Sequence, residues 1–461
     1  MPSKLQTGLR AVLVTVAAAA AAAAATAFAA VSPEEAAHLK TDLTPFGAEK
    51  AGNKAGTIPA WTGGYTTPLP NYKDGGRRPD PFANEKPLFT VNARNMEQYA
   101  DQLSEGVKAL MKKYPDFRID VYPTHRTAAA PQWVYDNTFK NATRARIVGG
   151  GAGPQPDGAY GGTPFPIPKS GVEAIYNHEL RWSPPAAKLE KVRGYLVTSD
   201  GRRVLIREGT YDYQWPYYIK DGEAKYADTG EYWFARGIYT GPPVRAGESI
   251  AARFNRDESR SNLWSYLPGQ RRARKVPNPC CDTATPSSGG LANLDEAWVF
   301  SARTDRFDWK LVGKKEMYIP YNSNRTLVPT RDTDVLGEHF LNPDHVRWEL
   351  HRVWVVEATL KPGRRHTSPK SRYYLDEDTW IAVLADRWDA NGQLARMPIA
   401  IPVLVPDLPG QISLYWGIYD LTSGTLFMDF MMNQSPSQIR LIAPLPDGGF
   451  TPDWLIGQGL R

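Results

Sequence analysis

From Leu189 to the end of the chain, short segments of alternating polar and apolar residues follow one another, and this pattern restricts the fold most. Turn residues such as Ser199-Asp200-Gly201 and Pro268-Gly269 separate the segments. Alternation at every second residue is typical of strands with one buried face, and short turns join antiparallel neighbours. The pattern therefore predicts a mainly β protein built on one large antiparallel sheet.

The expected strands share this alternation and are separated by Gly, Pro or Asp. They cover residues 192–197, 204–207, 232–239, 250–255, 263–267, 272–276, 307–318, 347–360, 371–375, 380–388, 394–404, 411–419 and 425–432. The chain also contains 14 Trp, 23 Tyr and 15 Phe. Aromatic side chains favour strands, so the composition supports the pattern.

Helical patterns are few. Met96, Tyr99, Leu103, Val107 and Leu110 recur at three- and four-residue steps, which predicts a helix over residues 92–114. A short helix is also expected after Ser32, since Pro33 and Glu35 complete a helix-start pattern. Residues 44–87 lack an apolar period and read as an irregular arm. We therefore expect an N-terminal region over residues 30–188 and a sheet domain over 189–461, in one continuous unit.

So few helices leave part of a large sheet uncovered, and a concave apolar surface is a common place for small-molecule sites. In the strand 347–360, Trp348, Leu350, Trp354 and Val356 fall on one face, interrupted by Arg352. We predict that this face lines a ligand cavity together with side chains of neighbouring hairpins. These are Tyr232, Phe234 and Leu263.

The N-terminus has the three-part layout of a secretory signal peptide. Lys4 and Arg10 precede an apolar run over residues 11–25, and Ala27-Phe28-Ala29 supplies small residues for cleavage. An apolar run of about 15 residues is shorter than a membrane span. We expect residues 1–29 to be removed and the mature chain to work in the periplasm without stable membrane insertion.

Charge gives little indication of a partner. The net charge is +6, and the densest basic runs, 271–275 and 361–366, are short. They are expected at solvated hairpin ends, and no nucleic-acid partner is expected for an exported chain. The chain's two cysteines are adjacent, Cys280 and Cys281. An exported pair is normally oxidised, but adjacent Cα atoms lie closer than in an ordinary disulfide, so a vicinal bridge would be strained and readily reduced. The sequence leaves the redox state of the pair open and favours a loop lock over a redox element.

The familiar catalytic and metal-binding motifs are missing from the sequence. His339, His345 and His351 are spaced by six residues but fall in different kinds of segment, which argues against a metal site. Asp376-Glu377-Asp378 is expected to be a solvated turn, and the glycines of 149–153 a flexible one. We therefore predict no catalytic residues, no metal and no cofactor.

Several long motifs resemble a proteobacterial family known as domain of unknown function 1329. They lie at residues 42–53, 56–64, 122–127, 162–168 and 308–318. Residues 263–272 and 372–380 also resemble hairpins of the LolA/LolB lipoprotein-carrier superfamily. That resemblance implies an open antiparallel half-barrel wrapped around helix, which holds acyl chains in its concavity. It supplies no catalytic residues.

The resemblance implies a non-enzymatic periplasmic carrier for a lipid-like ligand, serving an envelope transport system. Its expected partners are the hydrophobic ligand and an RND-type exporter or an outer-membrane protein. Two other functions stay open from the sequence. One is a periplasmic hydrolase acting on an envelope lipid or glycan, which requires a convergent nucleophile or carboxylate pair. The other is a scaffold that docks an exporter.

Overall fold

The structure is a computed structural model that describes residues 30–459 except 71, 74, 151, 152, 278, 279, 286, 287 and 302. The predicted signal peptide, residues 1–29, and the tip of the glycine turn, residues 151 and 152, lie outside the described residues. No helix in the described part of the chain is long and apolar enough to cross a membrane.

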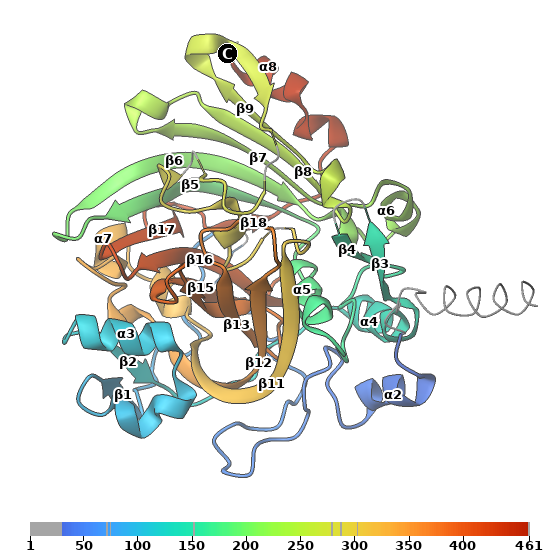
Figure 1. Cartoon of the computed structure of the whole chain (residues 1–461), viewed down its shortest axis with the longest axis vertical. Helices are drawn as coiled ribbons and strands as arrows, with labels where there is room; N and C mark the ends of the chain where they lie inside the picture. The colour runs from blue at the N-terminus through green and yellow to red at the C-terminus, as the bar shows by residue number, and fades with distance from the viewer. Residues whose placement is uncertain are drawn as a thin grey trace, which may run out of the picture.

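One 16-stranded sheet dominates the molecule (Figure 1). Its order is β1-β2-β12-β13-β14-β15-β16-β17-β5-β6-β7-β8-β9-β10, with β11 beside β12 and β18 beside β5. Neighbouring strands are antiparallel except β2 and β12, which meet in parallel at Val121 and Trp348. The described path runs from β1 to β10 without closing. The predicted mainly β class with a large, open antiparallel sheet is confirmed.

The strands follow the alternating segments closely. Their bounds are β1 Phe89–Asn92, β2 Arg118–Val121, β5 Ala186–Val197, β6 Arg203–Gln214, β7 Glu231–Gly241, β8 Ser249–Asn255, β9 Asn262–Leu267, β10 Arg272–Lys275, β11 Phe307–Pro320, β12 Trp348–Leu360, β13 Lys370–Asp376, β14 Ala382–Trp388, β15 Leu394–Val405, β16 Gly410–Asp420, β17 Thr425–Met431 and β18 Ile439–Leu441. A separate hairpin pairs β3 Arg146–Gly150 with β4 Gly153–Asp157. The basic run 271–275 is mostly exposed on β10, at the open edge of the sheet.

The helices are short. They are α2 Pro33–Ala37, α3 Glu105–Lys113, α4 Gln132–Arg144, α5 Gly171–Glu179, α6 Glu223–Thr229, α7 Asp332–Val335 and α8 Pro452–Gly459. The capping box predicted at Ser32 is present at the start of α2. The sequence missed α4 and α5, and α5 packs against β11 and β12.

The helix predicted over residues 92–114 is wrong in its extent. Its first part is a 3-10 helix, Met96–Gln102, and α3 begins only after Ser104. Leu103 between them has extended backbone, and the Ser104 hydroxyl accepts a hydrogen bond from the Val107 N–H. Ser104 acts as an N-cap and starts a new helix. The regular spacing of apolar residues continues across it, so the spacing alone predicts a single helix. The second part, α3, packs on β14 and β15.

The N-terminal arm is bound to the sheet. Trp380 Nε1 donates to the carbonyl of Phe46 at 2.9 Å. Arg126 links the arm to the sheet, since it donates to the Lys50 carbonyl at 3.2 Å and to Asp378 at 2.9 and 2.7 Å. One hydrophobic core contains residues from both sides of the boundary predicted at residue 188. The arm therefore covers a sheet face that the sequence reading left open.

Candidate functional site

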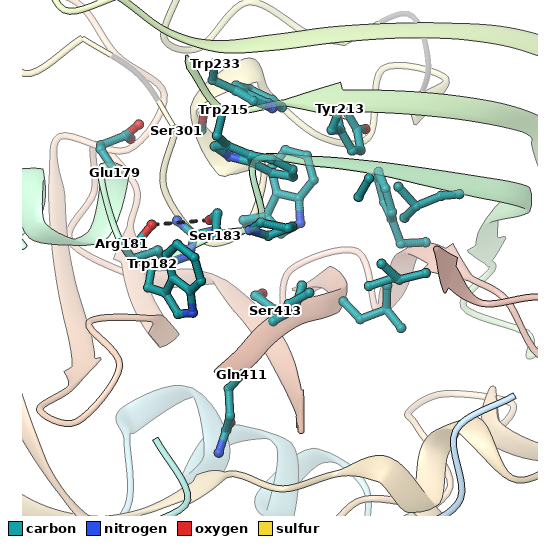
Figure 2. Close-up of a pocket in the computed structure, with 18 of the residues that line it drawn as sticks. Glu179, Arg181, Trp182, Ser183, Tyr213, Trp215, Trp233, Ser301, Gln411 and Ser413 are labelled. Carbon is teal, nitrogen blue, oxygen red and sulfur yellow. Dashed lines mark hydrogen bonds between the residues drawn. The ribbon is translucent and has the colours of Figure 1, made fainter. Parts of the chain in front are cut away.

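A cavity lies where β5, β6 and β7 curve over β16 and β17 (Figure 2). It holds about 780 Å³ of empty space, which includes solvent at its open side. The chain after α5, residues 181–184, and the loop 298–301 complete the wall.

Aromatic side chains form much of the cavity wall. Trp215, Trp233 and Trp298 are half-buried, while Tyr213 and Phe430 are buried. The Trp298 ring meets those of Trp233 and Phe430 at centroid distances of 5.3 Å each. The aliphatic remainder of the wall comes from β5, β16 and β18. It consists of Ala187, Leu189, Ile412, Leu414 and Ile439.

Ion pairs hold the loop that carries Trp298. Asp295 receives Arg387 Nη1 at 3.1 Å and His366 Nε2 at 2.9 Å. Trp298 and Val299 both have left-handed backbone, with φ of 48° and 77°. Such values are unfavourable for a side chain branched at Cβ, so the surrounding contacts must impose them. The loop is therefore fixed in a strained conformation that directs Trp298 to the cavity.

His178 ties the end of α5 to the sheet and to the same loop. The Ala382 N–H donates to His178 Nδ1 at 2.9 Å, so Nε2 carries the proton and donates to the Phe300 carbonyl, also at 2.9 Å. Burial, together with the charge of Arg181, holds the pKa of His178 well below its ordinary value. His178 is thus neutral and hydrogen-bonded at both ring nitrogens, which fixes the position of the chain after α5.

Charged groups gather at one end of the cavity. Figure 2 shows Glu179 and Arg181 together, with Tyr213 on the opposite side. The Glu179 carboxylate accepts a hydrogen bond from the Tyr232 hydroxyl at 3.3 Å. Glu258 lies near Glu179 in an adjoining pocket, and burial with that neighbouring charge raises the pKa of Glu258 well above its ordinary value. The charged groups of the cavity therefore lie at one end of it.

Arg181 is a cation without a salt bridge inside the described structure. Its Nη1 donates to the His178 carbonyl at 2.6 Å, and no carboxylate of the described residues lies within salt-bridge distance, although the charge of Glu179 favours its protonated form. Burial lowers the pKa of Arg181 to about 10, which leaves the guanidinium charged at neutral pH. A guanidinium offers several N–H donors in one plane, so most of its hydrogen-bonding capacity remains.

Among the predicted site residues, Tyr232 lies on the cavity wall. Trp348, Leu350 and Val356 are buried in the core, because β12 is covered on both faces. Trp354 stacks on Trp380 under the arm, with ring centroids 6.1 Å apart. Phe234 packs against Phe450, and Leu263 is half-buried on β9. The structure thus brings Tyr232 to this cavity and places the other predicted residues elsewhere.

The expectation of a solvated turn at residues 376–378 is wrong. The three residues form the tight turn between β13 and β14, but each is at most 1% exposed. Asp378 is paired with Arg126, and Glu377 receives Arg352 Nη1 at 3.1 Å and Lys314 Nζ at 2.8 Å. The arm binds all three cations, through the carbonyls of Lys50 and Ala51 and the carboxylate of Glu49, so its docking removes the turn from water.

The three histidines with six-residue spacing do not meet. His339 stacks on Tyr114, whereas His351 lies in β12 beside Glu349, with Nε2 3.0 Å from the carboxylate. His351, Asp376 and Asp378 bring ligand-type atoms within 4.8 Å of one another. Both Asp378 oxygens, however, already receive Arg126. We interpret the group as a buried ion-pair network.

Cys280 and Cys281 are joined as a vicinal disulfide. The carbonyl of Cys281 accepts a hydrogen bond from the Asp295 N–H at 3.1 Å. The pair therefore touches the base of the loop that carries Trp298, and lies outside the cavity wall.

Sequence reasoning missed the chain after α5 and the loop 298–301. A signal for α5 exists, because Ser170 and Glu173 form a capping box at its start. No comparable pattern marks Arg181 or Trp298, since their placement depends on contacts with Arg387, His178 and β16 that are distant in sequence.

Comparison with known proteins assigns the family. A family model described as "Protein of unknown function (DUF1329)" matches residues 90–455. The chain belongs to the DUF1329 family. An uncharacterized protein of Pseudomonas aeruginosa, PA3922, is 36% identical over 437 residues, covering 94% of this chain and 95% of that protein. The resemblance seen in the motifs is thereby confirmed.

Solved structures show more distant similarity. A DUF1329 family protein from Desulfovibrio piger is 15% identical with a TM-score of 0.42, over 62% of this chain and 97% of that one. A putative outer membrane lipoprotein-sorting protein domain from Vibrio parahaemolyticus is 11% identical with a TM-score of 0.42, over 62% and 98%. A LolA superfamily protein from Nitrosomonas europaea is 15% identical with a TM-score of 0.36, over 62% and 100%.

Proposed function

We propose that this DUF1329 protein is a non-enzymatic carrier that binds a lipid-like molecule in the cavity between β5–β7 and β16–β17. The observation that supports the proposal is the half-buried aromatic wall of Trp215, Trp233 and Trp298 around the cavity. Burying apolar ligand surface there contributes about 25 cal/mol per Å², or about 0.8 kcal/mol per CH₂ group. A medium-length hydrocarbon chain gains several kcal/mol without any catalytic group.

We also propose that the carrier works in the periplasm, after removal of residues 1–29, and passes its ligand to an envelope transport system. The support is the sequence layout of Lys4, Arg10, the apolar run and Ala27-Phe28-Ala29. An RND-type exporter or an outer-membrane protein is the proposed recipient.

The test compares two half-buried tryptophans, one on the cavity wall and one outside it. Wild type, Trp215→Ala and Trp354→Ala are purified from the periplasm and analysed by native mass spectrometry, with solvent extraction of bound lipid. We expect wild type and Trp354→Ala to retain a hydrophobic ligand and Trp215→Ala to lose most of it.

Trp354 is the matched control because it is also half-buried, yet contacts Trp380 and Lys314 instead of the cavity. Equal ligand recovery from all three proteins, or loss from Trp354→Ala alone, contradicts the assignment of the cavity. A wild-type protein free of any hydrophobic ligand, which also fails to bind added fatty acids or alcohols, contradicts the carrier function.

A further inference from the structure

Arg181 is a charged group of the cavity wall that apolar binding does not use. A buried cation is costly unless a counter-charge or hydrogen bonds compensate it. Its guanidinium donates to the His178 carbonyl at 2.6 Å and feels the charge of Glu179, but no carboxylate in the described chain lies within salt-bridge distance of it. By contrast, the fully buried arginines Arg126 and Arg387 have direct salt bridges, to Asp378 and to Asp295, whereas Arg181 is half-buried.

The position of Arg181 is set firmly. It follows α5, whose end is fixed by the two hydrogen bonds of His178 to Ala382 and Phe300. On its other side, Trp182 Nε1 donates to the Pro409 carbonyl at 2.9 Å. The carbonyl end of α5 favours a cation at this place, which offsets part of the cost of burial. A preorganised cation at the edge of an apolar cavity is suited to an anionic group of a ligand.

The geometry of the cavity also gives the ligand a direction. Arg181 lies at one end and Tyr213 at the other (Figure 2). Beyond the charged end, the wall is aromatic or aliphatic apart from Ser183, Ser301, Gln411 and Ser413. A molecule with one charged end and one hydrocarbon chain can contact both the charged end of the cavity and its mainly apolar wall.

We propose that the ligand is a single-chain amphiphile with an anionic head, carboxylate or phosphate, and that Arg181 binds this head while the chain lies against Trp215, Trp233 and Trp298. This inference rests on the proposed carrier function. Glu179 stands beside Arg181 and opposes the anion, so it limits the affinity and favours release of the ligand to a recipient.

The test varies the head group at constant chain length. Isothermal titration calorimetry measures the binding of decanoate, decyl phosphate, decanol and decyltrimethylammonium to wild type, each below its micelle concentration. We expect decanoate or decyl phosphate to bind at least about tenfold more tightly than decanol, and decyltrimethylammonium to bind most weakly. The stronger of the two anions identifies a fatty acid or a phosphate ester as the head group.

Variants assign the preference to Arg181. Arg181→Gln is expected to bring decanoate affinity down to that of decanol, with decanol affinity unchanged, whereas Arg181→Lys retains part of the preference. Glu179→Gln is expected to strengthen decanoate binding two- to tenfold. Arg202→Gln, in an exposed turn, serves as the matched control and is expected to behave as wild type.

Each outcome decides one question. If wild type binds decanol as tightly as decanoate, or Arg181→Gln weakens both equally, the head-group assignment is wrong while the carrier function stands. If wild type binds none of the four compounds, the carrier function itself is wrong. Should Arg181→Gln fail to fold, the wild-type ranking and the Glu179→Gln result still decide the assignment.

Discussion

The strands β12–β14 and the cavity between β5–β7 and β16–β17 are both rich in tryptophan and buried charge, yet they are built differently. Around β12, Trp348 is 3% exposed and the buried acids Glu377 and Asp378 have cationic partners. Around the cavity, Trp215 is half-buried, and no carboxylate of the described residues lies within salt-bridge distance of Arg181. The first region completes its interactions within the chain, whereas the second is the region that we propose for ligand binding.

The largest expected effect is in the closed region. Arg126→Ala leaves the buried Asp378 without its counter-charge, which typically costs about 3–5 kcal/mol of unfolding free energy. Urea unfolding measures the loss. Arg146→Ala, which breaks an exposed pair with Asp157, is the control and should cost less than about 1 kcal/mol. Equal effects of the two variants would show that the arm contributes little to stability.

A pair of tryptophans tests the same contrast directly. Trp348→Ala should cost about 3–5 kcal/mol, as expected for a packed aromatic side chain, and leave ligand affinity unchanged. Trp215→Ala should cost only about 1–2 kcal/mol, because its ring already lacks neighbours on the cavity side, and should reduce ligand affinity. Thermal unfolding and ligand titration of both variants measure these effects. If Trp348→Ala lost ligand affinity and Trp215→Ala lost stability alone, the binding site would lie at β12 instead.

Asp376 predicts a pH dependence of the closed region. Burial and the nearby Asp378 raise the pKa of Asp376 from 3.8 to about 7. The folded state therefore holds a proton that the unfolded state releases between about pH 4 and pH 7, so this group lowers stability as the pH rises through that window. The charged or titratable groups around it are His351, Glu349, Tyr321, Glu377, Asp378 and Arg126.

Asp376→Asn should remove this dependence. Its side-chain oxygen can still accept the hydrogen bonds that Thr379 donates to Asp376, so the turn is preserved. Relative to wild type, the variant should gain stability from pH 5 to pH 8, by at most a few kcal/mol. Urea unfolding across this range is the measurement, with the exposed Asp116→Asn as control. A constant difference between variant and wild type would contradict the raised pKa.

The smallest effect is expected at the disulfide. Replacing Cys280 and Cys281 by Ser should cost less than about 1 kcal/mol, since the bond closes almost no loop and stabilises little through the unfolded chain. Asp295 keeps Arg387 and His366, so the loop carrying Trp298 should hold its place. Thermal unfolding and ligand titration test this. Loss of ligand binding in the double variant would assign the disulfide a part in shaping the cavity.

The sequence predicted the strands well because their alternation is local, and nearly every segment from 192–197 to 425–432 contains a strand. It could not place the site. The face of Trp348 looks uncovered until Arg126, 252 residues from Asp378, brings the arm across the turn. Arg181 and Trp298 are positioned by contacts of His178 and Arg387 with residues far away in the sequence. Such contacts produce no periodic pattern that a sequence reading can detect.

The docking of the arm also bears on how the chain becomes folded. Phe46 and Trp380 are 334 residues apart in the chain, and Val121 at the end of β2 must find Trp348. Contacts of such long separation form late and slow folding, because the intervening chain must first be ordered. The covered face of β12 therefore forms only after the C-terminal strands that the arm contacts have been ordered. Contacts between the arm and the sheet are expected among the last to appear during refolding.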